Sequence, residues 1–211
     1  MKTNFLLQIL TAFLVLIFAN SCEKSKETIY NWNEVRIPKS GAVYAMSGNV
    51  ESRLIIAGNG EVFASESGGE EWSVVLEGIT AYELRAKADT LYAIALYNKT
   101  YTDFYSVDNG NSWTVSKTKA MNDLRYSQVE DSKGNLYRLV LDNTYPKRPD
   151  GIIKSKDAGR SWEEIFPFKR YIYSIYLDEA DRLYVGTNGW DWNGDAFENL
   201  SSESGYIYYL E

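Results

Sequence analysis

The sequence predicts an all-β fold, a small β-propeller of four blades with four antiparallel strands in each blade. Three observations support this prediction. Short strand-like stretches alternate with turn signals along most of the 211 residues, one tryptophan-containing motif occurs three times, and the two ends of the chain match each other. A repeat of about forty to fifty residues built from such strands is typical of propeller blades.

The motif is an eight-residue segment with serine first, glycine fifth and tryptophan last. It reads SESGGEEW at 65–72, SVDNGNSW at 106–113 and SKDAGRSW at 155–162, and aspartate is third in the second and third copies. A short polar side chain can accept hydrogen bonds from nearby backbone amides, and glycine adopts turn conformations that strain other residues. The motif therefore predicts a turn held by its own side chains.

This pattern resembles the Asp-box, or BNR, repeat of sialidase-like and related β-propellers. The resemblance implies that the boxes lie at the periphery of the blades, away from any ligand, and that their residues are structural. Those residues are Ser65, Gly69, Trp72, Ser106, Asp108, Gly110, Trp113, Ser155, Asp157, Gly159 and Trp162.

The strands of each blade can be written in order around these turns. The first blade is expected to use 42–47, 53–58, 61–66 and 72–77, and the second 81–86, 90–96, 102–107 and 113–117. The third uses 124–130, 135–141, 151–155 and 162–168, and the fourth uses 171–177, 182–188 and 205–211. The fourth blade thus lacks one outer strand.

The missing strand is found at the other end of the chain. Residues 30–46 match residues 160–176 position for position, with Trp32 on Trp162. We expect this N-terminal strand to pair with the C-terminal one and to close the ring, which leaves no open sheet edge there. Because related propellers usually have more blades, a fragment and a larger ring shared by two copies remain alternatives.

Residues 1–21 have the features of a bacterial export signal: Lys2 is followed by an apolar run at 5–18 and then by Cys22. This arrangement resembles a bacterial lipobox, which implies cleavage before Cys22 and lipid attachment to it. Residues 22–28 would form a tether and residues 29–211 the propeller. The predicted location is the cell envelope, with a lipid anchor in a bacterial membrane, for which we expect the outer membrane; a plain secretory signal is the alternative.

Composition excludes several classes of function. The formal charge of −7 argues against nucleic acid or an anionic membrane surface as the ligand. The absence of histidine removes the usual general base, and a single cysteine rules out disulfides within the chain and zinc–thiolate sites. We therefore expect no cofactor and no metal, and the sequence does not define an oligomeric state.

The ligand is expected on the face opposite the repeated turns, where the loops between second and third strands differ in length. Long loops on a rigid scaffold often carry binding sites, and aromatic side chains beside Asn and Asp suit a glycan or a protein partner. The packing of Trp190 and Trp192 onto the propeller rim is the structural alternative. The candidate ligand-binding residues are Tyr97, Tyr101, Tyr145, Arg148, Trp190, Asp191, Trp192 and Asp195.

The segment 191–198 could be mistaken for a calcium loop, but Ala196 stands where such a loop requires glycine. We expect solvated loop carboxylates there instead.

An enzymatic alternative comes from the Arg-Ile-Pro triplet at Arg36, which sialidases use for the first of three carboxylate-binding arginines. In that interpretation Arg85 and Arg125 complete the triad. No motif supplies the nucleophile or the acid, and Glu83 beside Arg85 predicts an ion pair in the channel instead. The sequence thus favours a non-catalytic, lipid-anchored glycan-binding module, with a protein-binding scaffold and a sialidase-like hydrolase as alternatives.

Overall fold

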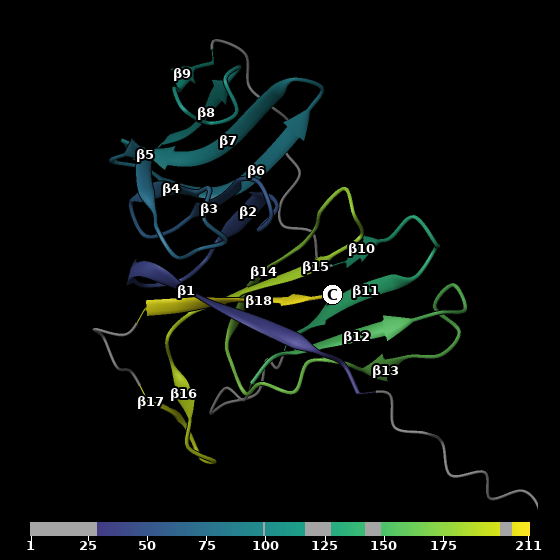
Figure 1. The fold of residues 1–211 in the computed structure, drawn as a ribbon. Helices are drawn as coiled ribbons and strands as arrows, with labels where there is room; N and C mark the ends of the chain where they lie inside the picture. Colours follow the sequence, from purple (N-terminus) through teal and green to yellow (C-terminus); the bar gives the residue numbers. More distant parts are fainter. Residues whose placement is uncertain (1–28, 99, 117–127, 142–148, 199–203) are drawn as a thin grey trace, which may run out of the picture. The chain divides into compact units, whose positions relative to one another are not determined.

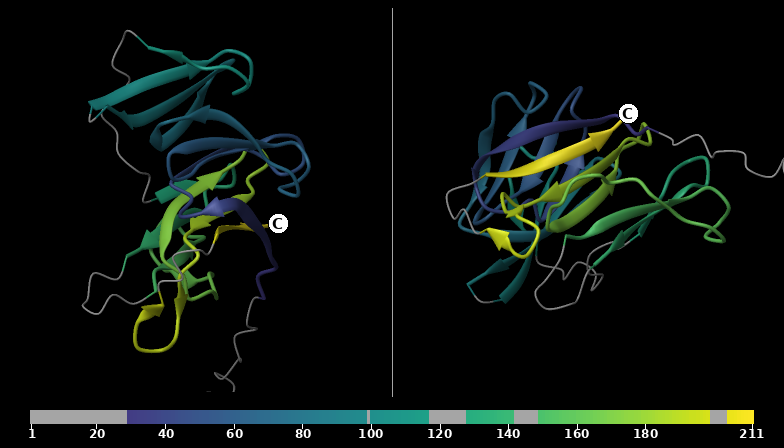
Figure 2. Two further views of the ribbon diagram at one scale, coloured as in Figure 1. Left: turned by 90° about the vertical axis from the view of Figure 1, so that its left-hand side faces the viewer. Right: turned by 90° about the horizontal axis from the view of Figure 1, so that it is seen from below.

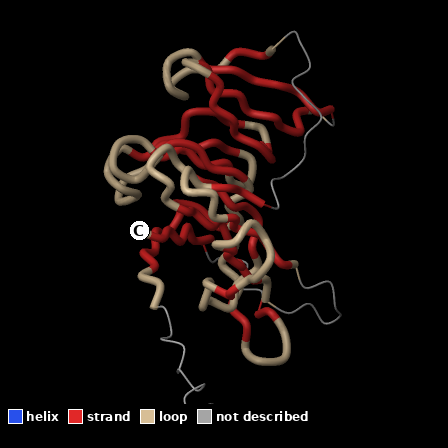
Figure 3. The backbone as a smooth tube through the Cα atoms, turned by 90° about the vertical axis from the view of Figure 1, so that its right-hand side faces the viewer, coloured by secondary structure: helices blue, strands red, loops and turns tan. Residues whose placement is uncertain are grey.

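The computed structural model describes residues 29–98, 100–116, 128–141, 149–198 and 204–211, and Cys22, Arg125, Tyr145 and Arg148 lie outside these ranges. The chain divides into two units, residues 1–30 and residues 31–211, and the following concerns the second unit. Within the described residues every regular element is a strand (Figure 3). No helix of this part of the chain is long and apolar enough to cross a membrane.

The strands form four antiparallel sheets of four strands, here called blades, as the sequence predicts (Figure 1). Blade one contains β2 (Ala45–Gly48), β3 (Leu54–Ala57), β4 (Glu61–Ser65) and β5 (Ser73–Glu77). Blade two contains β6 (Thr80–Lys87), β7 (Thr90–Tyr97), β8 (Thr100–Ser106) and β9 (Thr114–Val115). Blade three contains β10 (Gln128–Glu130), β11 (Leu136–Val140), β12 (Gly151–Ser155) and β13 (Glu163–Glu164).

Blade four is built from both ends of this unit, which confirms the predicted closure strand. Its strands are β14 (Ile172–Leu177), β15 (Leu183–Thr187), β18 (Ser204–Leu210) and β1 (Trp32–Ser40), in the order β14, β15, β18, β1. The first and last strands run antiparallel, with Trp32 opposite Leu210 and Arg36 opposite Tyr206. They lie side by side in both views of Figure 2. The alternation of buried and exposed residues on β1 fits an outer strand with one face on the core.

The blades pack through apolar faces. Strands of blade two contact blade one, blade one contacts blade four, and blade four contacts blade three. The link from blade two to blade three contains residues 117–127, which lie outside the described part. The interface of blades one and four contains fully buried residues from both: Leu54, Ile56, Tyr184 and Ile207.

Side-chain hydrogen bonds join neighbouring blades at the end of the sheets that carries the repeated turns, here called the turn face. The Ser132 amide donates to Asp181 at 2.8 Å and joins blade three to blade four. Arg182 donates to Glu51 at 2.6 Å and joins blade four to blade one, while Arg53 donates to Asn111 at 2.8 Å and joins blade one to blade two.

The three repeated turns share one hydrogen-bond pattern. The first serine accepts from the backbone amide of the glycine at 2.8–2.9 Å, and the tryptophan Nε1 donates to the carbonyl of that glycine at 2.9–3.1 Å. In the third turn Asp157 also accepts from the Ser161 amide at 2.8 Å; in the first turn Ser67 replaces the aspartate and accepts from the Glu71 amide at 2.7 Å. The glycines have φ of +80° to +91°, a region that favours glycine.

Asp157 makes the third turn sensitive to acid. Hydrogen bonds from the side chain and amide of Ser161, and then from Ser155, lower the pKa of Asp157 from 3.8 to about 2. A carboxyl whose folded pKa is depressed stabilises the fold above its unfolded pKa, and this contribution disappears as the pH falls through the folded pKa.

We therefore expect Asp157→Asn to unfold at a lower temperature than the parent at neutral pH. The difference should shrink as the pH falls from 3.8 toward about 2. Thermal unfolding across this pH range measures the effect, with Asp195→Asn on the opposite face as the control. A difference that stays constant with pH would contradict the assignment.

Candidate binding face

The face opposite the repeated turns, here called the loop face, carries the candidate site. The second-to-third strand connections and the connections between blades end there. The connection in blade four contains a hairpin of its own, β16 (Asp191–Trp192) paired with β17 (Phe197–Glu198). Asn193 closes its turn by accepting from the amides of Asp195 and Ala196 at 2.9 and 3.0 Å. The segment 191–198 therefore forms a hairpin whose turn is capped by the side chain of Asn193.

Three tyrosines lie at or directly before the start of the innermost strands of blades one, two and four: Tyr44 before β2, Tyr82 in β6 and Tyr173 in β14. Tyr82 and Tyr173 each fall at a register shift of the first strand against the second, which is the mark of a β-bulge. In blade one the Tyr44 amide bonds the carbonyl of Ala57 at 2.9 Å, although Ala45 is the ladder partner of that residue. A bulge adds one residue and re-aims a side chain, which accounts for the direction of Tyr82 and Tyr173.

These residues, Tyr44, Tyr82 and Tyr173, are here called the tyrosine triad. The ring of Tyr44 lies edge-on to the other two, at centroid distances of 5.6 Å to Tyr82 and 5.2 Å to Tyr173. All three line a channel of about 390 Å³ between the innermost strands. Each ring is half-buried, so the triad presents aromatic surface at the mouth of the channel.

Glu83 and Arg85 form an ion pair that lines the same channel, which confirms the ion-pair interpretation of these residues. The arginine triad is not supported by the placement of Arg36. That residue lies exposed on β1, the outermost strand of blade four, three strands away from the innermost strand that borders the channel. The triplet belongs to the strand that completes blade four, so this placement of Arg36 favours the non-catalytic interpretation over the sialidase alternative.

Further aromatic rings extend the triad in both directions. Tyr101 lies 6.4 Å from Tyr82 on one side, and Tyr171 lies 4.9 Å from Tyr173 on the other. Tyr171 in turn lies 6.0 Å from Phe197, which lies 5.2 Å from Trp192 across the hairpin. We call this row the aromatic belt; it consists of Tyr101, Tyr82, Tyr44, Tyr173, Tyr171, Phe197 and Trp192, with Trp190 beside Tyr171 at 6.3 Å.

The predicted ligand-binding residues are thus brought together only in part. Tyr101, Trp190 and Trp192 belong to the belt or border it, whereas Tyr97 packs against Phe104 within blade two at 5.9 Å. Asp195 lies exposed in the hairpin turn, and the backbone of Asp191 pairs with Glu198. Sequence reasoning missed Tyr44, Tyr82, Tyr171 and Tyr173; a tyrosine near the start of each of three innermost strands was the available signal.

The expected loop of blade two is also corrected by the structure. The expected strands 90–96 and 102–107 place Tyr97 and Tyr101 in the connection between them, but β7 continues to Tyr97 and β8 begins at Thr100. Asn98, with a φ of +48°, allows a tight connection between these strands. Tyr101 therefore projects from a strand and is 61% exposed.

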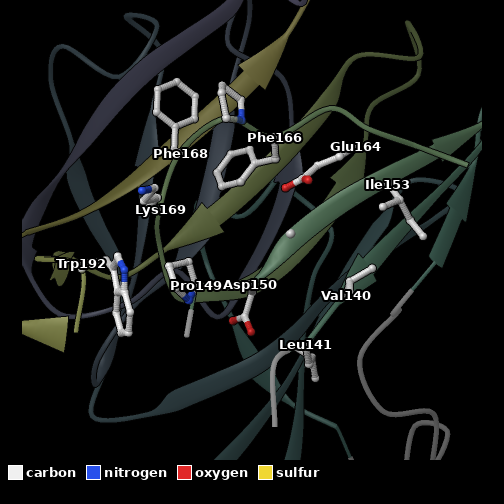
Figure 4. Close-up of a pocket in the computed structure, with 13 residues that line it drawn as sticks. Val140, Leu141, Pro149, Asp150, Ile153, Glu164, Phe166, Phe168, Lys169 and Trp192 are labelled. Carbon is white, nitrogen blue, oxygen red and sulfur yellow. The ribbon is translucent and has the colours of Figure 1, made fainter. Parts of the chain in front are cut away.

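A larger hollow of about 1040 Å³ lies on the loop face between blades three and four. Figure 4 shows Trp192 and Pro149 at its border together with Phe168, Lys169 and Asp150. The carboxylate of Asp150 is buried and accepts from the Ile172 amide at 3.0 Å. Phe168 stacks on Tyr208 at 4.1 Å. The lining is thus an aromatic wall with fixed charges, and the hairpin residue Trp192 borders both the hollow and the belt.

Four four-stranded antiparallel blades, of which blades one, two and four line a channel with their innermost strands, define this chain as a β-propeller. No family model matches the sequence. Residues of the chain are 26% identical over 95 positions to vacuolar protein sorting/targeting protein 10 of Schizosaccharomyces pombe, a match to 44% of this chain and 6% of that protein.

Three solved structures are among those similar to this chain. YCF48 from Cyanidioschyzon merolae is 13% identical with a TM-score of 0.36, and the match covers 79% of this chain and 58% of that one. A protein of unknown function from Bacteroides thetaiotaomicron is 10% identical with a TM-score of 0.40, over 86% and 76% of the two chains. The GH74 enzyme of Niastella koreensis is 16% identical with a TM-score of 0.32, over 84% and 37%. This chain thus spans little more than half of YCF48.

Proposed function

We propose that this chain is a membrane-anchored, non-catalytic propeller that recognises extracellular glycan through the aromatic belt. The observation that carries the proposal is the belt itself, a row of half-exposed rings contributed by three blades on one face. Sugars present apolar C–H faces and a rim of hydroxyls, so they suit aromatic rings with polar groups beside them. Asn59, which accepts from the Tyr44 hydroxyl at 2.7 Å, is one such polar neighbour.

The anchor and the subclass rest on the sequence. The repeated turns follow the Asp-box pattern, and Cys22 follows an apolar leader as in bacterial lipoproteins. Each buried methylene of an acyl chain stabilises membrane binding by about 0.8 kcal/mol, so several chains on Cys22 would hold the protein at the outer membrane. The belt would then face ligand outside the cytoplasm.

The non-catalytic character rests on the arrangement of charges at the channel. A sialidase-like site requires arginines converging on a carboxylate. Here Arg85 is paired with Glu83, and Arg36 lies on an outer strand. The chain also has no histidine to serve as a general base.

A glycan array tests the proposal. We expect the chain from Glu23 onward to bind a subset of glycans and the Trp190→Ala, Trp192→Ala double variant to lose most of that signal. Tyr105→Ala is the matched control, because Tyr105 is an aromatic residue next to the turn face. The same samples should not hydrolyse a fluorogenic sialoside.

Absence of glycan signal from folded protein would contradict glycan recognition. Crosslinking and co-purification would then look for a protein partner, which the same aromatic surface also suits. Sialoside turnover that Arg36→Ala abolishes would contradict the non-catalytic assignment.

A further inference from the structure

The shape and charge of the belt narrow the class of glycan. We infer that the ligand is a linear, uncharged oligosaccharide that lies along the belt over several rings, and not a single terminal or acidic sugar. This inference rests on the proposed function.

The continuity of the belt supports an extended ligand. Consecutive rings from Tyr101 to Trp192 are separated by 4.9 to 6.4 Å between centroids, without a break between blades two, one and four. One monosaccharide would cover only one or two of these rings. The others would remain as an apolar surface in water, and such surfaces on soluble domains usually mark interaction sites. A chain of sugars uses the whole row.

The channel under the triad is too small for the whole ligand. Its volume of about 390 Å³ lies at the lower end of the range for small-molecule pockets, about 300–1,000 Å³. The buried Glu83 and its partner Arg85 occupy its wall. The oligosaccharide therefore crosses the mouth of the channel, and at most a substituent of one sugar points into it.

The charges near the belt disfavour an acidic sugar. Recognition of a carboxylate favours an arginine fork that is available to it. Arg85 is paired with Glu83, and the Arg170 guanidinium lies 4.7 Å over the Tyr206 ring and donates to the Trp190 carbonyl at 3.3 Å.

The remaining charged side chains at this end of the belt also disfavour an acidic sugar. Lys169 lies in the neighbouring hollow, which it shares with Asp150 and Glu164. The exposed hairpin adds Asp195 and Glu198 beside Trp192. A negative ligand would meet this acidic rim, so a neutral one is preferred.

Calorimetric titration of the full chain in detergent tests the inference. The probes are cello-, manno- and malto-oligosaccharides from the monosaccharide to the hexasaccharide, with sialyllactose as the acidic comparison. We expect affinity in one series to rise roughly two- to tenfold with each added sugar, as stacking on one more ring would give, and then to level off. Sialyllactose should bind more weakly than neutral trisaccharides.

Variants at the two ends of the aromatic belt test whether long ligands contact the whole belt. Trp192→Ala and Tyr101→Ala should each weaken the longest probes and leave the shortest unchanged, because both residues lie at the ends of the belt. Tyr105→Ala should leave the whole series unchanged. Affinity that does not depend on length, or tighter binding of sialyllactose, would overturn this inference while glycan recognition stands. Failure of all probes together with a blank glycan array would overturn the proposed function itself.

Discussion

A chain that starts at Gly41, and so lacks β1, is expected to lose cooperative folding. That strand covers the outer edge of blade four, where Val35 and Ile37 are 9% and 2% exposed. Burial of such a side chain contributes about 1.5–3 kcal/mol. Trp32 also donates from its indole to the Ile165 carbonyl of blade three at 2.8 Å. Together these losses approach the total stability of an ordinary domain, about 5–15 kcal/mol.

Thermal unfolding followed by near-ultraviolet circular dichroism measures this effect against the chain from Glu23 onward. A circular permutant is the control: it starts at Gly41 and carries residues 31–40 after Glu211 through a short glycine-rich turn. Because Trp32 lies opposite Leu210 in the ladder, a hairpin connection can join the two strands there. The permutant should fold. Unchanged unfolding of the truncated chain would contradict the role given to β1.

The four blades could be predicted because their signals are local. Each repeated turn contains its own serine, glycine and tryptophan partners within eight residues, so the sequence shows the turn directly. The pairing of the chain ends is a distant contact, but the match around Trp32 and Trp162 made one strand recognisable as a copy of another. The repeat therefore revealed a contact between residues far apart in the sequence, which a single sequence without repeats does not show.

The binding face was harder to predict, because bulges leave no periodic signal. Tyr82 occupies the extra position of a bulge, so a strict alternation of faces misplaces its ring. Tyr101 falls in the expected connection between 90–96 and 102–107, yet it belongs to β8, which begins at Thr100 after a tight connection. The three-residue match at Arg36 supported only an alternative interpretation, and the position of Arg36 on the outer strand β1 does not support a place in the channel.

The tyrosines of the belt are expected to become strongly protected from oxidation when a glycan is bound. Tyr101 is exposed and the others are half-buried in the free protein, so hydroxyl radicals reach them, and a stacked sugar would cover the ring faces. Trp72, Trp113 and Trp162 belong to the repeated turns at the opposite end of the blades. Their oxidation should not change when the glycan binds, so these aromatic residues serve as an internal control for the belt residues.

Hydroxyl-radical footprinting with mass spectrometry, with and without the best glycan from the array, is therefore the most direct measurement of the binding face. We predict a several-fold fall in the oxidation of Tyr44, Tyr82, Tyr101, Tyr173 and Trp192, with the turn-face tryptophans unchanged. Protection confined to the turn face, or binding without any protection of the belt, would contradict the assignment of the loop face as the glycan site.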